Sequence, residues 1–254
     1  QFKMGKFFNE DSCAYEFMTY FLDTLSQIVL PSDNGRTFLT PGDFQLNIFT
    51  YTTSLPCQHV LRRHEDPLNV MMLSPADLQQ INKAIEDSPR VSIPHVKVSL
   101  QQLWDAYFAT ETSEQIHCHR DKCQSHLRTR SRTLTTAPND LIVFVNRTRP
   151  QDGQTRLDFS IISSEVLQVV CVPPMRPVPV VRTYEIRGFI EHLGRKVSTG
   201  HYVSFVRSPP SSSNPDETYY MADDSSVVEV SENKFSTHAK RASLFLFQLK
   251  QAPQ

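Results

Sequence analysis

One histidine near the C-terminal end of the chain sits where acid–base chemistry would be expected. Glycine occurs only seven times in 254 residues, yet Gly188, Gly194 and Gly200 lie close together. Glycine permits backbone conformations and close approaches that other residues do not. His201 follows the last of the three and opens an apolar stretch typical of a strand. An imidazole in that position is well placed to transfer protons near neutral pH.

Two adjacent carboxylates, Asp223 and Asp224, follow the next expected strand, 218–221. If the two strands form a hairpin, these carboxylates return to the end at which His201 lies. One of them would then accept the ring N–H and orient the imidazole, as in a nucleophile–base–orienter set. Because successive strand residues point to opposite faces, one acid reaches the ring more easily, and we expect it to be Asp223. The alternative is a hydrogen-bonded histidine beside a polar turn, without catalysis.

Cysteine and histidine side chains in two other places have the types that bind zinc. Tetrahedral zinc takes four nitrogen or sulfur ligands, and a β-ribbon that joined the two places would supply them. The alternative is a subdomain held together by packing alone. The first place contains Cys57 and His59, and the second contains His117, Cys118, His119 and Cys123, from which we expect a ligand set of Cys57, His59, Cys118 and Cys123.

The composition fits a folded domain of enzyme size and argues against two classes of partner. Hydrophobic residues make up 39%, and 26 Lys and Arg against 27 Asp and Glu give a net charge of −1. This balance disfavours a protein that binds mainly nucleic-acid phosphate or anionic membrane, and no apolar run reaches the length of a membrane span. Five cysteines without a secretory signal indicate a reducing compartment, the cytoplasm or nucleus.

The elements that must position these residues change character along the chain. The first third is expected to be helical, with helices that begin near Ser12, at Pro75 after a Ser74 cap, and after Ser99 with a capping box. After about residue 135, β-branched and aromatic runs predict strands. The sequence therefore predicts an α+β fold whose C-terminal half is an antiparallel sheet. The expected strands are 141–146, 157–162, 166–172, 178–192, 201–207, 218–221, 227–230 and 244–249.

Four segments of the C-terminal half resemble the histidine box of ubiquitin-specific proteases. They read YEIRGFIEHLG at 184–194, GHYVSF at 200–205, YYMADDSSV at 219–227 and LFLF at 244–247. The family pattern is roughly Y-x-L-x-A-V-x-x-H-x-G, G-H-Y-x-x-Y, W-x-x-F-D/N-D-x-x-V and Y-x-L-F-Y. Tyr219 replaces the usual Trp and Ala222 the usual Phe, so the packing beneath the site is expected to differ.

The resemblance extends upstream and covers nearly the whole chain. The segment SCAYEFMTYFLDTL at 12–25 is similar to the family's Q-Q-D-A-x-E-F-L helix. The resemblance implies a papain-like cysteine protease with palm, thumb and fingers. Residues 1–110 would form a helical, thumb-like part with the start of the fingers, and 111–254 the fingers and palm sheet. It further implies a deubiquitinase that cleaves after the C-terminal glycine of ubiquitin, with ubiquitin and ubiquitinated proteins as partners.

The resemblance also implies roles for single residues. His201 would be the general base, Asp223 its orienter and Asp224 a second acid, while Tyr202 and Glu16 would contact the substrate. The family carries two C-x-x-C zinc pairs, from which this chain departs at both places, because Val60 stands at the second cysteine position after Cys57 and the other pair is C-x4-C. Structural zinc is therefore an expectation that rests on a modified ligand set.

The nucleophile of the family lies in an N-terminal box, roughly G-L-x-N-x-G-N-T-C-Y, that these residues do not contain. We expect it upstream of Gln1, since the chain does not begin with Met. The alternative is a relative that lost its nucleophile and holds ubiquitin as a scaffold. A third hypothesis makes Cys13 the nucleophile, because a helix N-terminus stabilises a thiolate. In the family register, however, Cys13 replaces an aspartate away from the attacking position.

Overall fold

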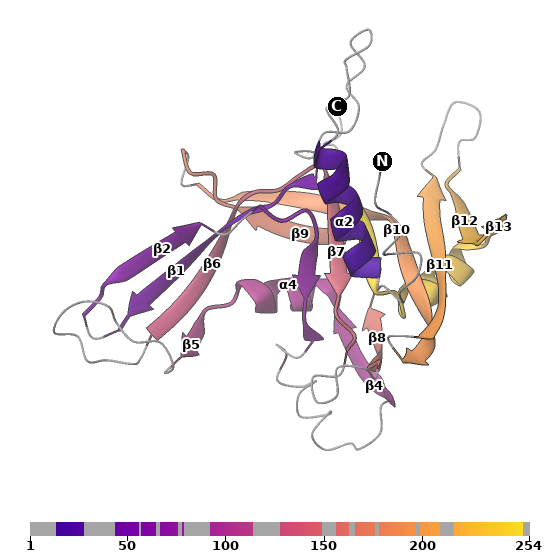
Figure 1. The fold of residues 1–254 in the computed structure, drawn as a ribbon, viewed down its shortest axis with the longest axis horizontal. Coiled ribbons are helices and arrows are strands. Elements are labelled where there is room, and N and C mark those ends of the chain that lie inside the picture. Colours follow the sequence, from indigo (N-terminus) through magenta and orange to yellow (C-terminus); the bar gives the residue numbers. More distant parts are fainter. Residues whose placement is uncertain are drawn as a thin grey trace, which may run out of the picture.

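The structure is a computed structural model of the 254-residue chain. It describes residues 14–27, 44–55, 57–64, 67–75, 78, 92–113, 128–148, 156–162, 166–175, 178–196, 199–208 and 216–250. Strands predominate among these residues, and the N-terminal helix lies across the front of the main sheet in Figure 1.

An eight-stranded sheet forms the body of the molecule (Figure 1). Its neighbours pair antiparallel, except that β3 pairs parallel with β7 at one edge. The order is β13 (Ser226–Val230), β12 (Thr218–Asp223), β11 (Thr199–Ser208), β10 (Val180–Lys196), β14 (Leu244–Leu249), β7 (Asp140–Val145) and β3 (Met71–Leu73), and β9 (Val166–Cys171) pairs with the first part of β10 on the edge opposite β14.

All eight strands expected after residue 135 are present, one of them, β8 (Asp158–Ile162), outside this sheet. The reason is visible in the burial of alternate residues. In β9, Leu167, Val169 and Cys171 are buried while the residues between them are exposed, the period-two pattern that allows one face to pack. The prediction of an antiparallel C-terminal sheet is therefore confirmed.

A second, four-stranded sheet projects from the body on the left of Figure 1. Its order is β2 (Val60–His64), β1 (Asn47–Ser54), β6 (Arg128–Thr136) and β5 (Glu111–Ser113). The arginines of β6 are buried or half-buried. Arg128 is buried, and Arg132 forms an ion pair with Glu111 at 2.7 Å and covers the ring of Tyr107.

The expectation of a helical first third is not confirmed. Among the described residues, two helices lie in this part, α2 (Ala14–Gln27) and α4 (Leu100–Phe108), but so do β1, β2, β3 and β4 (Ser92–Ser99), the last paired parallel with β8. The sequence of β1, NIFTYTTS, is rich in β-branched and aromatic residues, which favours a strand. The helix expected at Pro75 lies mostly outside the described residues. Its start is a turn in which the Leu78 amide donates to the Pro75 carbonyl.

Helix α4 begins as the sequence predicts. The Ser99 hydroxyl accepts from the Gln102 amide at 3.0 Å, and the Gln102 side chain accepts from the Ser99 amide at 2.9 Å, which completes a capping box. Leu100, Leu103 and Trp104 are buried on its inner face. Helix α5 (Glu232–Ala239) is capped by Ser231 and buries Phe235.

Helix α2 buries a different face from the one expected. The spacing of Phe17 and Phe21 suggests that both face the core, but they are 40% and 42% exposed and stack on each other. Leu22 is buried instead, with Tyr15 and Met18 against the sheet. The prediction was wrong because apolar residues surround this helix, so that spacing alone does not select one stripe.

The two faces of the eight-stranded sheet have different covers. The small front cluster packs α2 against Val70, Ile142 and Leu244. The larger cluster behind the sheet contains α4, α5 and a stack of aromatic rings with Phe189 at its centre, 4.8 Å from both Phe205 and Phe235. Of the helices that the structure describes, none is long and apolar enough to cross a membrane.

Candidate active site

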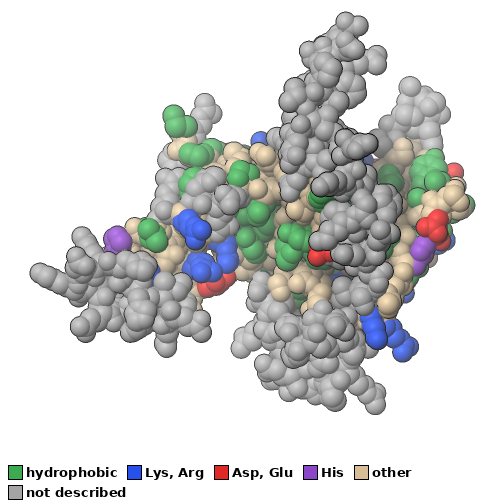
Figure 2. All heavy atoms as spheres, in the orientation of Figure 1, with side chains coloured by type: hydrophobic (Ala, Val, Ile, Leu, Met, Phe, Trp, Pro, Cys, Tyr) green, Lys and Arg blue, Asp and Glu red, His purple; other side chains and the backbone are tan. Residues whose placement is uncertain are grey.

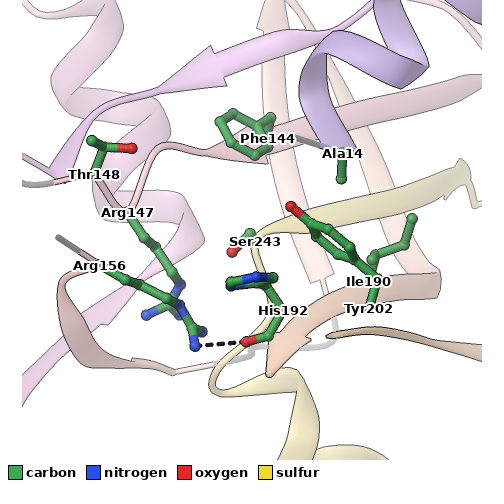
Figure 3. A pocket seen from close by; sticks show the side chains of 9 residues that line it. All are labelled: Ala14, Phe144, Arg147, Thr148, Arg156, Ile190, His192, Tyr202 and Ser243. Carbon is green, nitrogen blue, oxygen red and sulfur yellow. Dashed lines mark hydrogen bonds between the residues drawn. The ribbon is translucent and has the colours of Figure 1, made fainter. Parts of the chain in front are cut away.

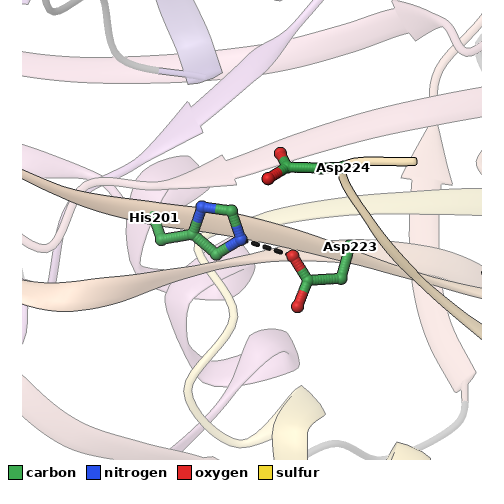
Figure 4. Close-up of side chains that lie close together, drawn as sticks. All are labelled: His201, Asp223 and Asp224. Atoms are coloured by element: carbon green, nitrogen blue, oxygen red, sulfur yellow. Dashed lines mark hydrogen bonds and ion pairs between the residues drawn. The ribbon is translucent and has the colours of Figure 1, made fainter. Parts of the chain in front are cut away.

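The hairpin of β11 and β12 brings His201 and Asp223 together. The strands pair from Ser204 opposite Ala222 onward, so His201 and Asp223 lie just beyond the last pair. His201 Nε2 and Asp223 Oδ1 are 2.5 Å apart (Figure 4). The juxtaposition expected from the sequence is therefore present. Both side chains are accessible, at 43% and 42% exposure, so a substrate can reach the ring.

Asp224 lies in the two-residue turn that joins β12 to β13. Its φ is 49°, a left-handed conformation that Asp tolerates better than most residues. The nearest polar atoms of His201, Asp223 and Asp224 lie within 4.8 Å of one another. Figure 2 shows the acidic and histidine side chains gathered over this end of β11 and β12.

These carboxylates change the acidity of the imidazole. The hydrogen bond to Asp223 raises the pKa of His201, burial opposes that shift, and the charges of Asp223 and Asp224 raise the pKa further. When Nε2 carries the proton that Asp223 accepts, Nδ1 is the nitrogen left to take a proton from a nucleophile or give one to a leaving group. The arrangement is that of an oriented general base.

Two glycines and a second histidine shape the backbone next to His201. A Cβ added to Gly200 would lie 2.3 Å from His192 Nε2 and 2.7 Å from the Leu193 carbonyl oxygen. One added to Gly194 would lie 2.5 Å from the Thr199 carbonyl oxygen. Only glycine fits these two positions without displacing the His192 ring or the opposite strand. The glycine cluster seen in the sequence is thus a requirement of close packing.

A narrow pocket lies in front of the sheet, between the start of α2 and the end of β10 (Figure 3). Its volume is about 40 Å³, room for a few water molecules. Tyr202, predicted to contact substrate, lines it beside the His192 ring, with 4.7 Å between the ring centroids. The other predicted contact, Glu16, is exposed on α2 two residues after Ala14, which also lines the pocket.

The predicted zinc ligands are only partly within the described residues. Cys57 and His59 are half-buried in the loop between β1 and β2, whereas Cys118 and Cys123 lie outside the described residues. Across the described part of the chain, the group of His, Asp, Glu or Cys side chains close enough to share a metal is His201 with Asp223 and Asp224.

The described cysteines do not supply a nucleophile for His201. Cys57 is in the other sheet, and Cys171 is buried at the end of β9 that pairs with Val180, at the far end of β10. Burial raises the pKa of the Cys171 thiol, which disfavours the thiolate. Cys13 lies outside the described residues, so the hypothesis that it is the nucleophile stays untested.

Three buried or half-buried basic side chains beside the pocket had no assigned role in the sequence analysis: Arg147, Arg156 and His192. Arg147 donates to the carbonyl groups of Phe159, Lys240 and Ala242 at 2.7–3.0 Å. Burial lowers its pKa to about 9, which leaves the guanidinium charged at neutral pH. The one sequence signal was an arginine directly after an apolar strand, where a solvated side chain is the more common outcome.

Comparisons with known proteins agree with this geometry. A protein-family model described as ubiquitin carboxyl-terminal hydrolase matches residues 4–247. Among curated proteins, the chain is similar to Ubiquitin carboxyl-terminal hydrolase 21 of Arabidopsis thaliana. The two are 41% identical over 51 residues, which is 20% of this chain and 6% of that protein.

Solved structures share the fold. The chain is similar to a SAGA DUB module of Ubp8, Sgf11, Sus1 and Sgf73 bound to monoubiquitin, with a TM-score of 0.66, 18% identity, and 94% and 49% of the two chains covered. For the same module bound to ubiquitin aldehyde, the TM-score is 0.66 and the identity 18%, with 94% of this chain and 50% of that chain covered. For a yeast SAGA DUB module with a mutant Sgf73, the TM-score is 0.65 and the identity 18%, with 94% of this chain and 51% of that chain covered.

The chain thus spans about half the length of these solved chains. The family match, in contrast, runs through almost all of its residues, from α2 to the last strand of the sheet. The chain belongs to the ubiquitin carboxyl-terminal hydrolase family, as the resemblance of its histidine box to ubiquitin-specific proteases predicts.

Proposed function

We propose that the complete protein is a thiol-dependent deubiquitinase that hydrolyses the peptide or isopeptide bond after the C-terminal glycine of ubiquitin. The observation that carries the proposal is the 2.5 Å contact between His201 and Asp223 at an accessible strand end beside a narrow pocket. Two of the similar structures contain monoubiquitin or ubiquitin aldehyde, which supports ubiquitin as the substrate.

In the proposed reaction, a thiolate from a cysteine expected ahead of Gln1 attacks the carbonyl carbon of the last glycine. The His201 imidazolium donates its Nδ1 proton to the leaving lysine amine, the C–N bond breaks and a thioester remains. Water then attacks the thioester and gives one proton to Nδ1. The C–S bond breaks, the thiolate returns, and ubiquitin leaves as a carboxylate after its acid proton passes to solvent.

The pocket beside Tyr202 supports a substrate with a narrow main chain. A volume of about 40 Å³ suits a chain without bulky side chains, and glycine residues occupy little more than their backbone. We propose that the diglycine end of ubiquitin passes along this pocket toward His201. Glu16, exposed on α2 near the same pocket, would then contact the residues that precede the diglycine.

The shape of the chain fits the hand-like arrangement that the resemblance implies. We assign the eight-stranded sheet to the palm, the projecting four-stranded sheet to the fingers and α2 to the thumb (Figure 1). In this assignment the body of ubiquitin rests between the fingers and the palm while its tail reaches the β11–β12 hairpin.

The test is the reaction of the complete protein with ubiquitin that carries a C-terminal electrophile, followed by mapping of the modified cysteine. We expect one adduct, on a cysteine upstream of Gln1, and loss of ubiquitin cleavage in His201→Gln. Arg187→Gln, on the same sheet but distant from the hairpin end, should retain activity and serves as the control. An adduct on Cys13 would replace our assignment of the nucleophile.

A catalytically inactive, ubiquitin-binding scaffold is the second candidate. It is favoured by the altered residues beneath the site, Tyr219 and Ala222, and by the location of the two described cysteines away from His201. A complete protein that binds ubiquitin at micromolar concentration but forms no adduct and cleaves no ubiquitin conjugate would establish this role and contradict the hydrolase.

A structural zinc ion in the four-stranded sheet is a further part of the proposal. Ser54 precedes the loop that contains Cys57, and Ser113 precedes the segment that contains Cys118 and Cys123. Both serines pair with Arg128, at one end of this sheet. Ser54, three residues before Cys57, and Ser113, five residues before Cys118, therefore lie at the same end of the sheet. Elemental analysis should give about one zinc per chain, reduced in Cys57→Ser; metal-free protein with an unchanged unfolding temperature would contradict the proposal.

A further inference from the structure

We propose that Arg156 is a positioning residue that fixes the β10–β11 hairpin and thereby holds His201 in its reactive geometry. The inference rests on the proposed function only in calling that geometry reactive. The contacts themselves are a property of the chain, and they connect a side chain outside both hairpin strands to the backbone of β10, the strand that pairs with the one carrying His201 (Figure 3).

Arg156 binds the end of β10 through backbone carbonyl groups. Its Nη1 donates to the His192 carbonyl at 2.7 Å and more weakly to the Gly194 carbonyl at 3.4 Å. Its main-chain amide donates to the Arg195 carbonyl at 3.1 Å. One residue thus binds three carbonyl groups near the end of β10, just before the chain reverses toward His201. These contacts restrain both the position and the twist of that strand.

The same guanidinium fastens the hairpin to the rest of the molecule. Nη2 donates to the Arg241 carbonyl at 2.7 Å. The Arg241 side chain pairs with buried Glu191 at 2.9 Å, and Glu191 also contacts His238 of α5 at 2.5 Å. Arg156 therefore joins β10 to the connection between α5 and β14, and the hairpin end cannot shift without breaking charge-assisted hydrogen bonds, which are stronger than neutral ones.

The restraint reaches His201 through His192. Arg156 binds the His192 carbonyl. The imidazole ring of His192 lies so close to Gly200 that a Cβ on residue 200 would overlap it. Gly200 directly precedes His201, which is paired with Leu193 across the hairpin. A displacement of His192 would accordingly move the backbone of His201 and lengthen its contact with Asp223.

Arg156 is a better candidate for this role than its neighbour Arg147. The carbonyl groups that Arg147 binds belong to β8 and to the α5–β14 connection, so that it stabilises the framework behind the site. Arg156 alone of the two contacts the hairpin end. Burial lowers the pKa of Arg156, yet Nη1 and Nη2 both donate to carbonyl groups, an arrangement that favours the charged guanidinium.

The experiment compares Arg156→Gln, Arg156→Lys and a control variant, Arg187→Gln, by NMR on the chain itself. Arg187 is near the middle of β10, and its side chain donates to Gln248 of β14, away from the hairpin end. Two quantities are measured: the titration of the His201 ring, and hydrogen exchange at Leu193, Gly200 and His201 relative to Ile142 and Leu246 in the centre of the sheet.

In Arg156→Gln we expect the His201 pKa to fall toward its ordinary value and exchange at the hairpin to accelerate by about tenfold or more, with exchange in the central strands unchanged. Lysine retains the charge and one contact. In Arg156→Lys, the fall in the His201 pKa and the acceleration of hairpin exchange should therefore both be smaller than in Arg156→Gln. If Arg156→Gln does not fold, the comparison of Arg156→Lys with Arg187→Gln decides. Unchanged titration and unchanged hairpin exchange in a folded Arg156 variant would overturn the proposal.

These measurements do not require hydrolysis, so a failure of the deubiquitinase proposal leaves their outcome intact. In a complete protein that cleaves ubiquitin, Arg156→Gln should lower kcat by about tenfold or more with a smaller change in KM, because it misplaces a group needed in the transition state. A rise in KM at constant kcat would instead make Arg156 a substrate-binding residue and contradict its positioning role.

Discussion

Among the single residues of the site, the two adjacent aspartates illustrate how strand geometry separates neighbours of identical chemistry. Asp223 is the last residue of β12 and contacts the His201 ring, whereas Asp224 occupies the following turn with a positive φ. Both carboxylates act on the same imidazole, one through a hydrogen bond and the other through its charge. The two are therefore expected to differ in the size of their effect and not in its sign.

The pKa of His201 should fall toward its ordinary value in Asp223→Asn and by less in Asp224→Asn, because only the first change removes the hydrogen bond. NMR titration of the ring measures both, and Asp216→Asn, on an exposed aspartate, is the control. The raised pKa also implies a stabilising contribution that is complete below the ordinary value of 6.5 and is lost as the pH rises through the raised one. An equal shift in the two variants would contradict the assignment of Asp223.

Replacement of Gly200 by alanine should destabilise the chain by about 1–3 kcal/mol, since the new Cβ would overlap the His192 ring and the Leu193 carbonyl. Urea unfolding measures the loss. Ser204→Ala, on the same strand, should stay within about 0.5 kcal/mol. If the overlap with the ring is the main cause, adding His192→Ala to Gly200→Ala should recover part of the stability, as a double-mutant cycle would show.

Among the elements, the strands of the C-terminal half and helix α4 could be predicted from local sequence because each carries its own signal. Alternating burial in β9 and the reciprocal Ser99–Gln102 cap of α4 are both readable in the residues themselves. The hairpin that joins His201 to Asp223 followed from two adjacent strands and a short polar connection. Local chemistry and the final fold agree in these segments.

Other features depended on distant contacts and could not be predicted. The buried face of α2 is chosen by the sheet it meets, and β3 becomes a strand by pairing with β7, far away in the sequence. The roles of Arg147 and Arg156 follow from carbonyl groups of β8, of β10 and of the α5–β14 connection, which lie far apart in the sequence. No spacing within a segment reports such partners, since backbone carbonyl groups have no sequence signature.

Removal of the helix cap in Ser99→Ala should lower the free energy of unfolding by about 1 kcal/mol, because the Gln102 amide loses its acceptor. Ser99→Asp keeps an oxygen at the cap and should remain within a few tenths of a kcal/mol of the original chain. Urea unfolding provides the measurement, provided that the dependence of the free energy of unfolding on urea concentration is the same in each variant. A neutral effect of Ser99→Ala would show that packing of Leu103 and Trp104 alone secures the start of α4.

Across the whole molecule, one continuous apolar cluster links the four-stranded sheet to the larger one. Leu46 and Ile48 from the β1 region, Leu134 from β6 and Phe245 from β14 belong to the same buried set. Helix α4 lies at this junction, where it contacts β6, β9 and β3. The two sheets are therefore expected to unfold together.

Trp104 allows a direct test, since it is the single tryptophan of the chain and is 3% exposed at that junction. Its fluorescence and the far-UV circular dichroism, which reports mainly on the strands, should give one coincident unfolding transition in urea. A fluorescence midpoint well below that of circular dichroism would mean that the four-stranded sheet separates first, as an independent unit.

Strand β10 makes the molecule intolerant of certain insertions and deletions. It is one uninterrupted strand of 17 residues, held by β9 and β14 along its first half and by β11 along its second. Neighbouring residues of a strand point to opposite faces of the sheet, so loss of one residue in the middle of β10 would exchange the faces on which Glu191 and His192 lie. The carboxylate would then point into the pocket, and the imidazole would take the place of Glu191 beside His238 and Arg241. Length changes in this strand can therefore be accommodated only in steps of two residues.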